Sequence, residues 1–408
     1  MSNINLFTHP ETFRRIQLKG LCAWLGQWRD YLARRGFTVP DPAADSAVDY
    51  EGLAAVFMEP DGEMPRQLMH SAAMIHEMAN EGAMGALLER ARQENIKLDV
   101  GDDPDPADVA VQMCLGHADV LEEVHNLHQL DRPRSFVHFT TDRRRVPTFR
   151  EPTDGALAGL EAEIAEWNFK AKRGRSARVW MYRRAHERWF LVRHGLASRR
   201  QEVITASGSE SVIQRPGEYD VLVYDCERGE LRIHGCNVKE VEMLRQVFGG
   251  HLFGDKEFFP GGEKFTLAPL LTGRACLACG DFPTLANVTL REVTVLRLTG
   301  SDWLRLTVNA PDLFGPVGRG DVTLPGVEGL VRATFELRFK DSKKRRTLTV
   351  AGSNRLKVVR DDDTTLLERW LAARGFVLEP EVDDEETANV VECAGEAGGW
   401  RGGGGVEA

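Results

Sequence analysis

The chain has 408 residues, of which 42% are hydrophobic and 28% charged, and its formal net charge at pH 7 is −10. This length exceeds what one hydrophobic core ordinarily organises, and the composition is that of ordinary globular proteins, so we expect two ordered domains and exclude wholesale disorder. No window reaches the roughly 18 consecutive apolar residues that a bilayer-spanning helix needs, so we predict a soluble protein with no membrane partner.

Residues 1–131 are predicted to form an acidic helical domain. Hydrophobic residues recur at helical spacing over residues 11–35, 64–93 and 106–130. Asp105 followed by Pro106 is a typical helix start, because aspartate caps the first amides and proline is tolerated at the first helical position. Residues 1–130 contain 10 basic and 21 acidic side chains, so this domain is expected to be negatively charged.

Residues 132–155 are predicted to be a proline- and arginine-rich connector. Pro133, Pro147 and Pro152 fall in this segment, together with three consecutive arginines at 143–145. Such a composition is typical of a linker or long loop, and it places the domain boundary here.

Residues 156–378 are predicted to form the second domain. We expect a helix over 156–172 and then short strands over 188–194, 201–206, 218–225 and 231–234, the last two forming a hairpin. Asn237 and Glu240 predict a capping box for a helix that ends near Gly249 and Gly250. Alternation over 331–339 predicts a half-buried strand, and a last helix is expected over 364–374. The fold class is therefore α+β, a helical N-terminal domain followed by a mixed, mostly antiparallel β-rich domain.

Residues 379–408 are predicted to be a disordered, acidic, glycine-rich tail. Few of these residues are apolar, so the segment cannot offset the entropy that ordering would cost. Residues 361–408 contain 3 basic and 13 acidic side chains, an excess equal to the net charge of the whole chain. A tail of this charge is expected to compete for any basic surface of the same chain.

A basic segment over residues 172–200 is the main candidate binding site. It holds ten basic side chains and one acidic one, with four aromatic residues between them. Arginine beside aromatic rings suits phosphate contacts combined with base stacking, so we predict binding of DNA or RNA. The candidate residues are Lys172, Arg173, Arg175, Arg178, Arg183, Arg184, Arg188 and Arg193, with a second basic group, Lys343, Lys344, Arg345 and Arg346, after the alternating strand. The alternative is that these side chains lie on solvated faces, protect a strand edge or pair with acidic residues of the same chain.

An enzymatic alternative starts from the predicted hairpin. Asp220 or Asp225, followed by Glu230-Leu231-Arg232, resembles the acidic and Glu-x-Lys elements of the PD-(D/E)xK nuclease family. The resemblance implies that the carboxylates hold a divalent metal and that the third element orients the attacking water. Here arginine stands in place of lysine, and a surface hairpin with charged turn residues is the alternative interpretation.

Two further patterns concern metals. Cys276 and Cys279 have the spacing of half a zinc knuckle, which Cys226, His234 and Cys236 would have to complete; unmodified thiols and a redox pair are the alternatives. The histidines of the helical domain, including Glu122-x-x-His125, lack the second Glu-x-x-His of a di-iron site, so we expect structural or surface histidines.

The chain contains no phosphate-binding loop, no dinucleotide fingerprint and none of the familiar hydrolase motifs. We therefore predict no catalytic residues, no metal and no cofactor in the leading hypothesis, a non-enzymatic cytoplasmic binding or accessory protein that contacts nucleic acid or a protein partner. The alternatives are the metal-dependent nuclease and a structural or assembly protein. Seven scattered cysteines favour reduced thiols in a cytoplasm, and frequent Ala, Arg and Gly with few Lys favour a bacterial source.

Overall fold

The computed structural model describes residues 5–378 except 44–46, 134, 142–148, 206–207, 300, 321–323, 325, 327–328 and 359–363. The described residues form two compact units. The first combines the chain up to Gly262 with the described part of Thr347–Thr364, and the second combines Glu263–Arg346 with the described residues from Thr365 onward. The predicted tail and the arginine run 143–145 lie outside the described residues.

The first unit begins with short helices. They are η1 (Asn5–Thr8), α1 (Pro10–Arg15), α2 (Leu18–Gly26), α3 (Arg29–Arg34), α4 (Tyr50–Met58), α5 (Arg66–Met78), α6 (Glu81–Gln93), α7 (Pro106–Gly116) and α8 (Ala118–Leu130). Each long helix predicted from periodicity is divided. The side chain of Asn80 accepts a hydrogen bond from the Ala83 amide and so starts α6, while His117, outside helical geometry, separates α7 from α8. Asp105 caps α7 as predicted.

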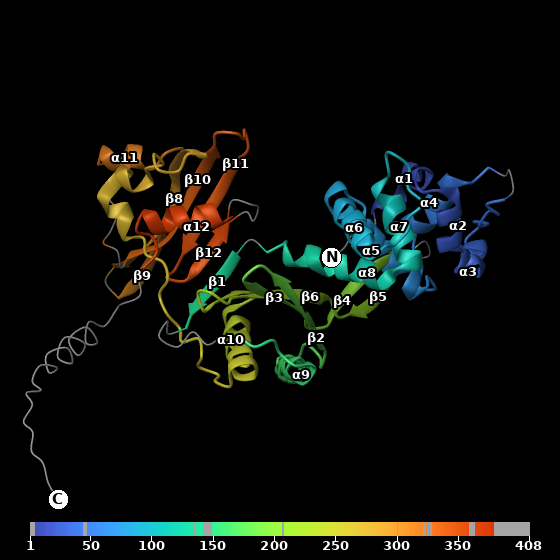
Figure 1. Cartoon of the computed structure of the whole chain (residues 1–408), viewed down its shortest axis with the longest axis horizontal. Helices are drawn as coiled ribbons and strands as arrows, with labels where there is room; N and C mark the ends of the chain where they lie inside the picture. The colour runs from blue at the N-terminus through green and yellow to red at the C-terminus, as the bar shows by residue number, and fades with distance from the viewer. Residues whose placement is uncertain are drawn as a thin grey trace, which may run out of the picture. The chain divides into compact units, whose positions relative to one another are not determined.

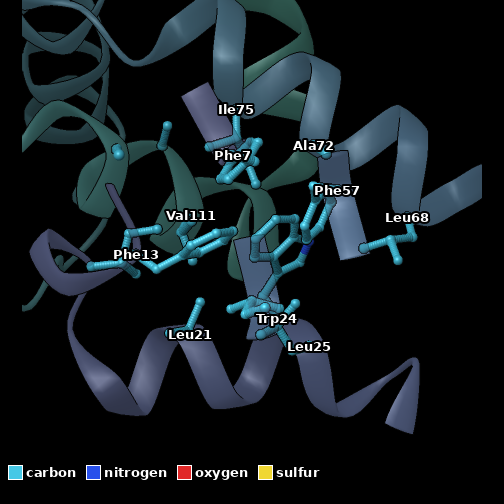
Figure 2. Close-up of a cluster of buried hydrophobic side chains, with 14 of the residues drawn as sticks. Phe7, Phe13, Leu21, Trp24, Leu25, Phe57, Leu68, Ala72, Ile75 and Val111 are labelled. Carbon is cyan, nitrogen blue, oxygen red and sulfur yellow. The ribbon is translucent and has the colours of Figure 1, made fainter. Parts of the chain in front are cut away.

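Aromatic side chains from four of these elements, η1, α1, α2 and α4, form the core of the helical part. Phe7, Phe13, Trp24 and Phe57 are almost fully buried, and their ring centroids lie 5.2–6.2 Å apart in the closest pairs (Figure 2). The indole Nε1 of Trp24 donates to Ser71 Oγ at 2.9 Å, so its polar atom is satisfied within the core. Burial of these rings holds helices together that are too short to be stable alone.

The strands of the first unit form one antiparallel sheet in the order β2-β3-β6-β7-β1-β12-β11. Their bounds are β1 (Ser135–Thr140), β2 (Ala177–Arg184), β3 (Glu187–Gly195), β6 (Gly217–Asp225), β7 (Glu230–His234), β11 (Arg345–Ala351) and β12 (Arg355–Val358). The predicted hairpin is β6–β7. Strand β1 lies inside the segment expected to be a connector, and it pairs with both β7 and β12. A separate hairpin consists of β4 (Arg199–Thr205) and β5 (Gly208–Gln214).

Helices cover both faces of this sheet (Figure 1). Helices α9 (Asp154–Lys170) and α10 (Val238–Phe253) pack on one face, against Phe190, Leu222 and Tyr224. Helix α8 packs on the other face, against Trp189 and Leu191. Because strand side chains alternate, neighbouring residues of β3 and β6 point to opposite helical layers. The Asn237 cap of α10 is confirmed, but the helix continues past Gly249 and Gly250 to Gly254, which has φ 77°.

The second unit has its own antiparallel strands in the order β10-β8-β9. They are β8 (Leu285–Thr299), β9 (Asp302–Asn309) and β10 (Leu330–Phe339), accompanied by η3 (Ala268–Leu277), α11 (Phe314–Gly318) and α12 (Thr364–Ala373). Phe335 of β10 packs edge-on against Trp370 and Phe376, which forms the centre of this core. The alternating strand and the last helix are confirmed at nearly the predicted bounds.

The predicted α+β class is confirmed, with helices concentrated in the N-terminal half and the strands mostly antiparallel. Within the described residues, no helix combines the length and the apolar character that crossing a bilayer requires.

Candidate functional site

Most arginines of the basic segment pair with carboxylates of the same unit. The pairs are Arg175–Glu166 at 3.1 Å, Arg178–Glu161 at 3.7 Å, Arg183–Glu151 at 3.1 Å, Arg188–Glu151 at 2.9 Å and Arg184–Asp131 at 2.6 Å. The acidic partners come from α9, from the segment before it and from the end of α8. Much of the positive charge of this segment is therefore balanced by acidic residues of the same chain, as the alternative interpretation of the segment predicted.

Two members of the segment differ from these surface pairs. Arg173 points inward, with a side chain 16% exposed, and donates to the buried Glu240 at 2.5 Å. Lys172 is exposed and adopts a left-handed backbone conformation, φ 64°, just after α9. Arg173 is thus placed to neutralise an interior carboxylate rather than to contact a ligand.

Arg193 has a different environment. It is exposed on β3, and its guanidinium lies 5.1 Å from the ring centroid of Trp180 on the neighbouring strand. Among the residues that the structure describes, no carboxylate lies within ion-pair distance of Arg193. A guanidinium held over an aromatic face keeps its charge and its outward-facing donors available for an anion.

Arg193 lines a groove of about 840 Å³ in the first unit. One wall comes from α5 and α8, and the other from β3, β6, β7 and the base of the β4–β5 hairpin. The charged and aromatic side chains of the lining are His70, Glu77, His125, Arg132, Arg193, Arg199, Glu218, Tyr219 and His234. The volume falls within the range of pockets that hold small ligands.

The charges in this groove favour an anion. Glu77 is already engaged, because its Oε2 lies 2.8 Å from His125 Nε2 and 3.1 Å from Arg132. The hydrogen bond to His125, together with the charges of His125 and Arg132, lowers the pKa of Glu77 to about 2. The groove lining thus contains three arginines and only two acidic residues. One of the two, Glu77, is already paired within the helical wall. The half-buried ring of Tyr219, the β6 partner of Arg193, adds an aromatic surface beside these arginines.

The second basic group belongs to the other compact unit. Lys343 and Lys344 are exposed in the turn after β10. Arg345 lies 3.4 Å from Glu336, and the guanidinium of Arg346 lies 4.4 Å from the ring centroid of Phe339. Arg345 and Arg346 are the first residues of β11 and contact side chains of β10, and none of the four basic residues lines the groove.

The three acidic residues of the nuclease alternative do not lie together. Asp225 and Glu230 are opposite each other in the β6–β7 ladder, so they share the face covered by α8. Asp220 is an even number of residues from Leu222 and Tyr224 and therefore faces α10, about 16 Å along the strand from Asp225. Glu230 contacts His138 Nδ1 at 2.5 Å, and Arg232 contacts Glu187. The structure thus brings together two of the three predicted ligands.

Asp220 instead belongs to a buried cluster with His194 and Glu240. His194 Nε2 lies 2.9 Å from Asp220 Oδ2 and 3.2 Å from Glu240 Oε1, and each side chain is about 1% exposed. Burial is the largest single influence on His194 and opposes its charge, but the hydrogen bond to Asp220, the charges of Asp220 and Glu240 and the contact with the Gly195 carbonyl together outweigh it and raise the pKa of this histidine. Burial also raises the pKa of Asp220.

The pair Cys276 and Cys279 gains no further ligands from its surroundings. Burial raises the pKa of Cys276 to about 11, and the Cys279 thiol donates to the Leu277 carbonyl at 3.3 Å. Among the described residues, neither cysteine belongs to a group of three metal-ligating side chains. Cys226, His234 and Cys236, considered as completing ligands, belong to the first unit, whereas the pair belongs to the second.

Comparison with known protein families and with curated proteins finds no match for this chain.

Several residues of the groove were not predicted from the sequence. Arg132 and Glu77 belong to no recognisable motif. Tyr219 lies in the predicted hairpin, but the sequence assigned it no binding role. Arg193 was named as a candidate contact, and Arg199 was counted in the basic segment without being named as one. The helical wall and the strand wall are more than a hundred residues apart in sequence for most pairs, so no local pattern indicates that they meet.

Proposed function

We propose that this chain is a non-enzymatic cytoplasmic binding protein that holds a short stretch of single-stranded nucleic acid in the groove between α5, α8 and the β3–β6 strands. The observation that carries the proposal is Arg193, exposed, stacked on Trp180 and flanked in the groove by Arg132 and Tyr219. Single-strand binding typically combines guanidinium contacts to phosphates with aromatic surfaces for the bases. The limited groove volume favours a single strand over a duplex.

The basic residues of the segment differ in the groups that they contact. Arg175, Arg183 and Arg188 already have carboxylate partners, so binding a phosphate there would require breaking an existing pair. Arg193 has an aromatic partner, so a phosphate adds a contact without removing one. The groove arginines are therefore expected to dominate binding, although they are a minority of the basic segment.

The test measures anisotropy of labelled single-stranded RNA and DNA and of a duplex, over a series of salt concentrations. Arg193→Ala is expected to weaken single-strand binding about tenfold and to lower the slope of log K against log salt by about 0.7. Arg175→Ala is the matched control, because Arg175 is exposed in the same segment but pairs with Glu166 and lies over Phe169. Equal losses in the two variants would contradict the groove assignment. Salt-insensitive or absent binding by the wild type would contradict the proposed function itself.

A further inference from the structure

The buried cluster behind the groove is an ion-pair network built from side-chain types that can also bind a metal ion. His194 comes from the end of β3, Asp220 from β6 and Glu240 from the first turn of α10. Their ligand atoms all lie within 4.8 Å of one another. Zinc bonds of 2.0–2.1 Å in a tetrahedral shell would separate ligand atoms by about 3.3 Å, and the His194 Nε2 distances to the carboxylates are 2.9 and 3.2 Å.

The orientation of His194 is that of a metal-binding histidine. Its Nδ1 lies 3.2 Å from the backbone carbonyl of Gly195, which leaves Nε2 directed at the two carboxylates. Metal-ligating histidines usually donate their second ring N–H to a carbonyl or carboxylate, which fixes the ring and the tautomer. The backbone thus provides the outer contact that such a ligand needs.

Asp220 provides the independent observation. It is 1% exposed, and its Oδ1 has no hydrogen-bond partner among the described residues. A buried carboxylate oxygen without a partner is costly, and a hydrogen-bond donor or a cation offsets that cost. Asp220 Oδ1 is therefore open to a further partner at the position that an ion would contact.

The remaining contacts are consistent with an outer shell around such an ion. Glu240 Oε1 accepts from Arg173 at 2.5 Å, and its Oε2 accepts from the Cys236 amide at 3.2 Å and from Asn237 Nδ2 at 3.3 Å. These donors fix the carboxylate in place. Without an ion, a proton on His194 Nε2 serves both carboxylates, so the alternative is a charge-balanced network of His194, Arg173, Asp220 and Glu240.

We propose that His194, Asp220 and Glu240 bind one divalent transition-metal ion, Zn²⁺ by the criterion of ligand type and spacing, as a structural clamp joining β3, β6 and the start of α10. Complete burial of the three side chains fits a closed structural site rather than an open catalytic one. Cys236 adjoins the cluster through its backbone amide, but its exposed side chain is not among the ligand atoms that lie within 4.8 Å of one another. This site stands on the face of β3 and β6 opposite Arg193 and Tyr219, and it does not depend on the proposed nucleic-acid binding.

The experiment uses the full chain, stripped with a chelator and titrated with Zn²⁺. We expect one tightly bound ion per chain by elemental analysis, and a rise in Tm of about 5 °C or more at 100-fold excess over Kd. Asp220→Asn is expected to weaken Zn²⁺ binding by more than about 100-fold. Asp225→Asn is the control, because Asp225 is buried on the same strand but belongs to a second His, Glu and Asp group on the other face. Zinc retained in Asp220→Asn, or lost in Asp225→Asn, overturns the assignment.

A second measurement covers the case in which Asp220→Asn does not fold. Co²⁺ added to the stripped wild type is expected to give the strong visible d–d bands of tetrahedral coordination. A wild-type chain that binds neither Zn²⁺ nor Co²⁺ stoichiometrically refutes the metal site and leaves the charge-balanced network as the role of these residues.

Discussion

Glu77 joins α5 to α8 across one wall of the groove, and replacing it by Gln removes its charge while keeping its shape. Its Oε2 lies 2.8 Å from His125 and 3.1 Å from both Gln129 and Arg132, and these contacts lower its pKa from 4.5 to about 2. At about 1.4 kcal/mol per pKa unit, the interaction is worth about 3 kcal/mol. The side chain is 15% exposed, and screening by water reduces the expected loss in Glu77→Gln to about 2 kcal/mol near neutral pH.

The pH dependence has a definite sign. Because the pKa of Glu77 is lower in the folded than in the unfolded chain, its contribution is complete above the unfolded value of about 4.5 and declines as the pH falls toward 2. Urea unfolding of wild type and variant should therefore show a difference in the free energy of unfolding that falls to about half by about pH 3. Glu123→Gln is the control, since Glu123 is 36% exposed and pairs with Arg90 on the surface, with an expected loss below about 1 kcal/mol. Equal losses in the two variants, or a loss in Glu77→Gln that does not change with pH, would refute the reasoning.

Two substitutions at single contacts and one truncation provide further tests. The hydroxyl of Tyr224 is buried and has no hydrogen-bond partner among the described residues, so Tyr224→Phe should stabilise the chain by about 1 kcal/mol; a loss of that size in urea unfolding would contradict this. Asn237→Ala should cost about 1 kcal/mol by the same assay, because the Asn237 side chain accepts from the Glu240 amide at 3.1 Å, and an unchanged midpoint would show that this cap is unimportant. A chain ending at residue 378 should bind single strands more tightly at low salt and equally at high salt, and identical anisotropy curves would exclude competition by the tail.

The sequence predicts the fold where a local signal exists. Asp105 with Pro106 and Asn237 with Glu240 each identified a helix start that the structure confirms, because capping depends only on neighbouring residues. Alternation identified β10 in the same way. Hydrophobic periodicity alone did not show where one helix ends and the next begins, since the apolar stripe continues through Asn80 and His117 while the backbone leaves the helix at each.

Elements that are stabilised by contacts between residues distant in sequence could not be predicted from local patterns. Strand β1 lies between prolines in a segment with linker composition, but Phe136, Val137 and Phe139 are buried because β7 and β12 flank it on both sides. The buried cluster of His194, Asp220 and Glu240 likewise depends on contacts between residues distant in sequence. Its three residues come from the predicted strands 188–194 and 218–225 and from the helix after Asn237, yet nothing in their spacing indicates that their side chains converge.

The basic segment illustrates why a count of charges is a poor measure of a binding surface. Ten basic residues against one acidic residue describe the segment in isolation, but folding brings Glu151, Glu161 and Glu166 beside it, because α9 and the residues before it lie along the same strands. Each surface pair contributes little to stability, but each lowers the potential that a phosphate would meet. The potential near Arg193 is not reduced in this way, because its neighbour is the uncharged ring of Trp180. The identity of the partner, carboxylate or aromatic ring, therefore determines which arginines are available to bind an anion, and that identity is fixed only by the fold.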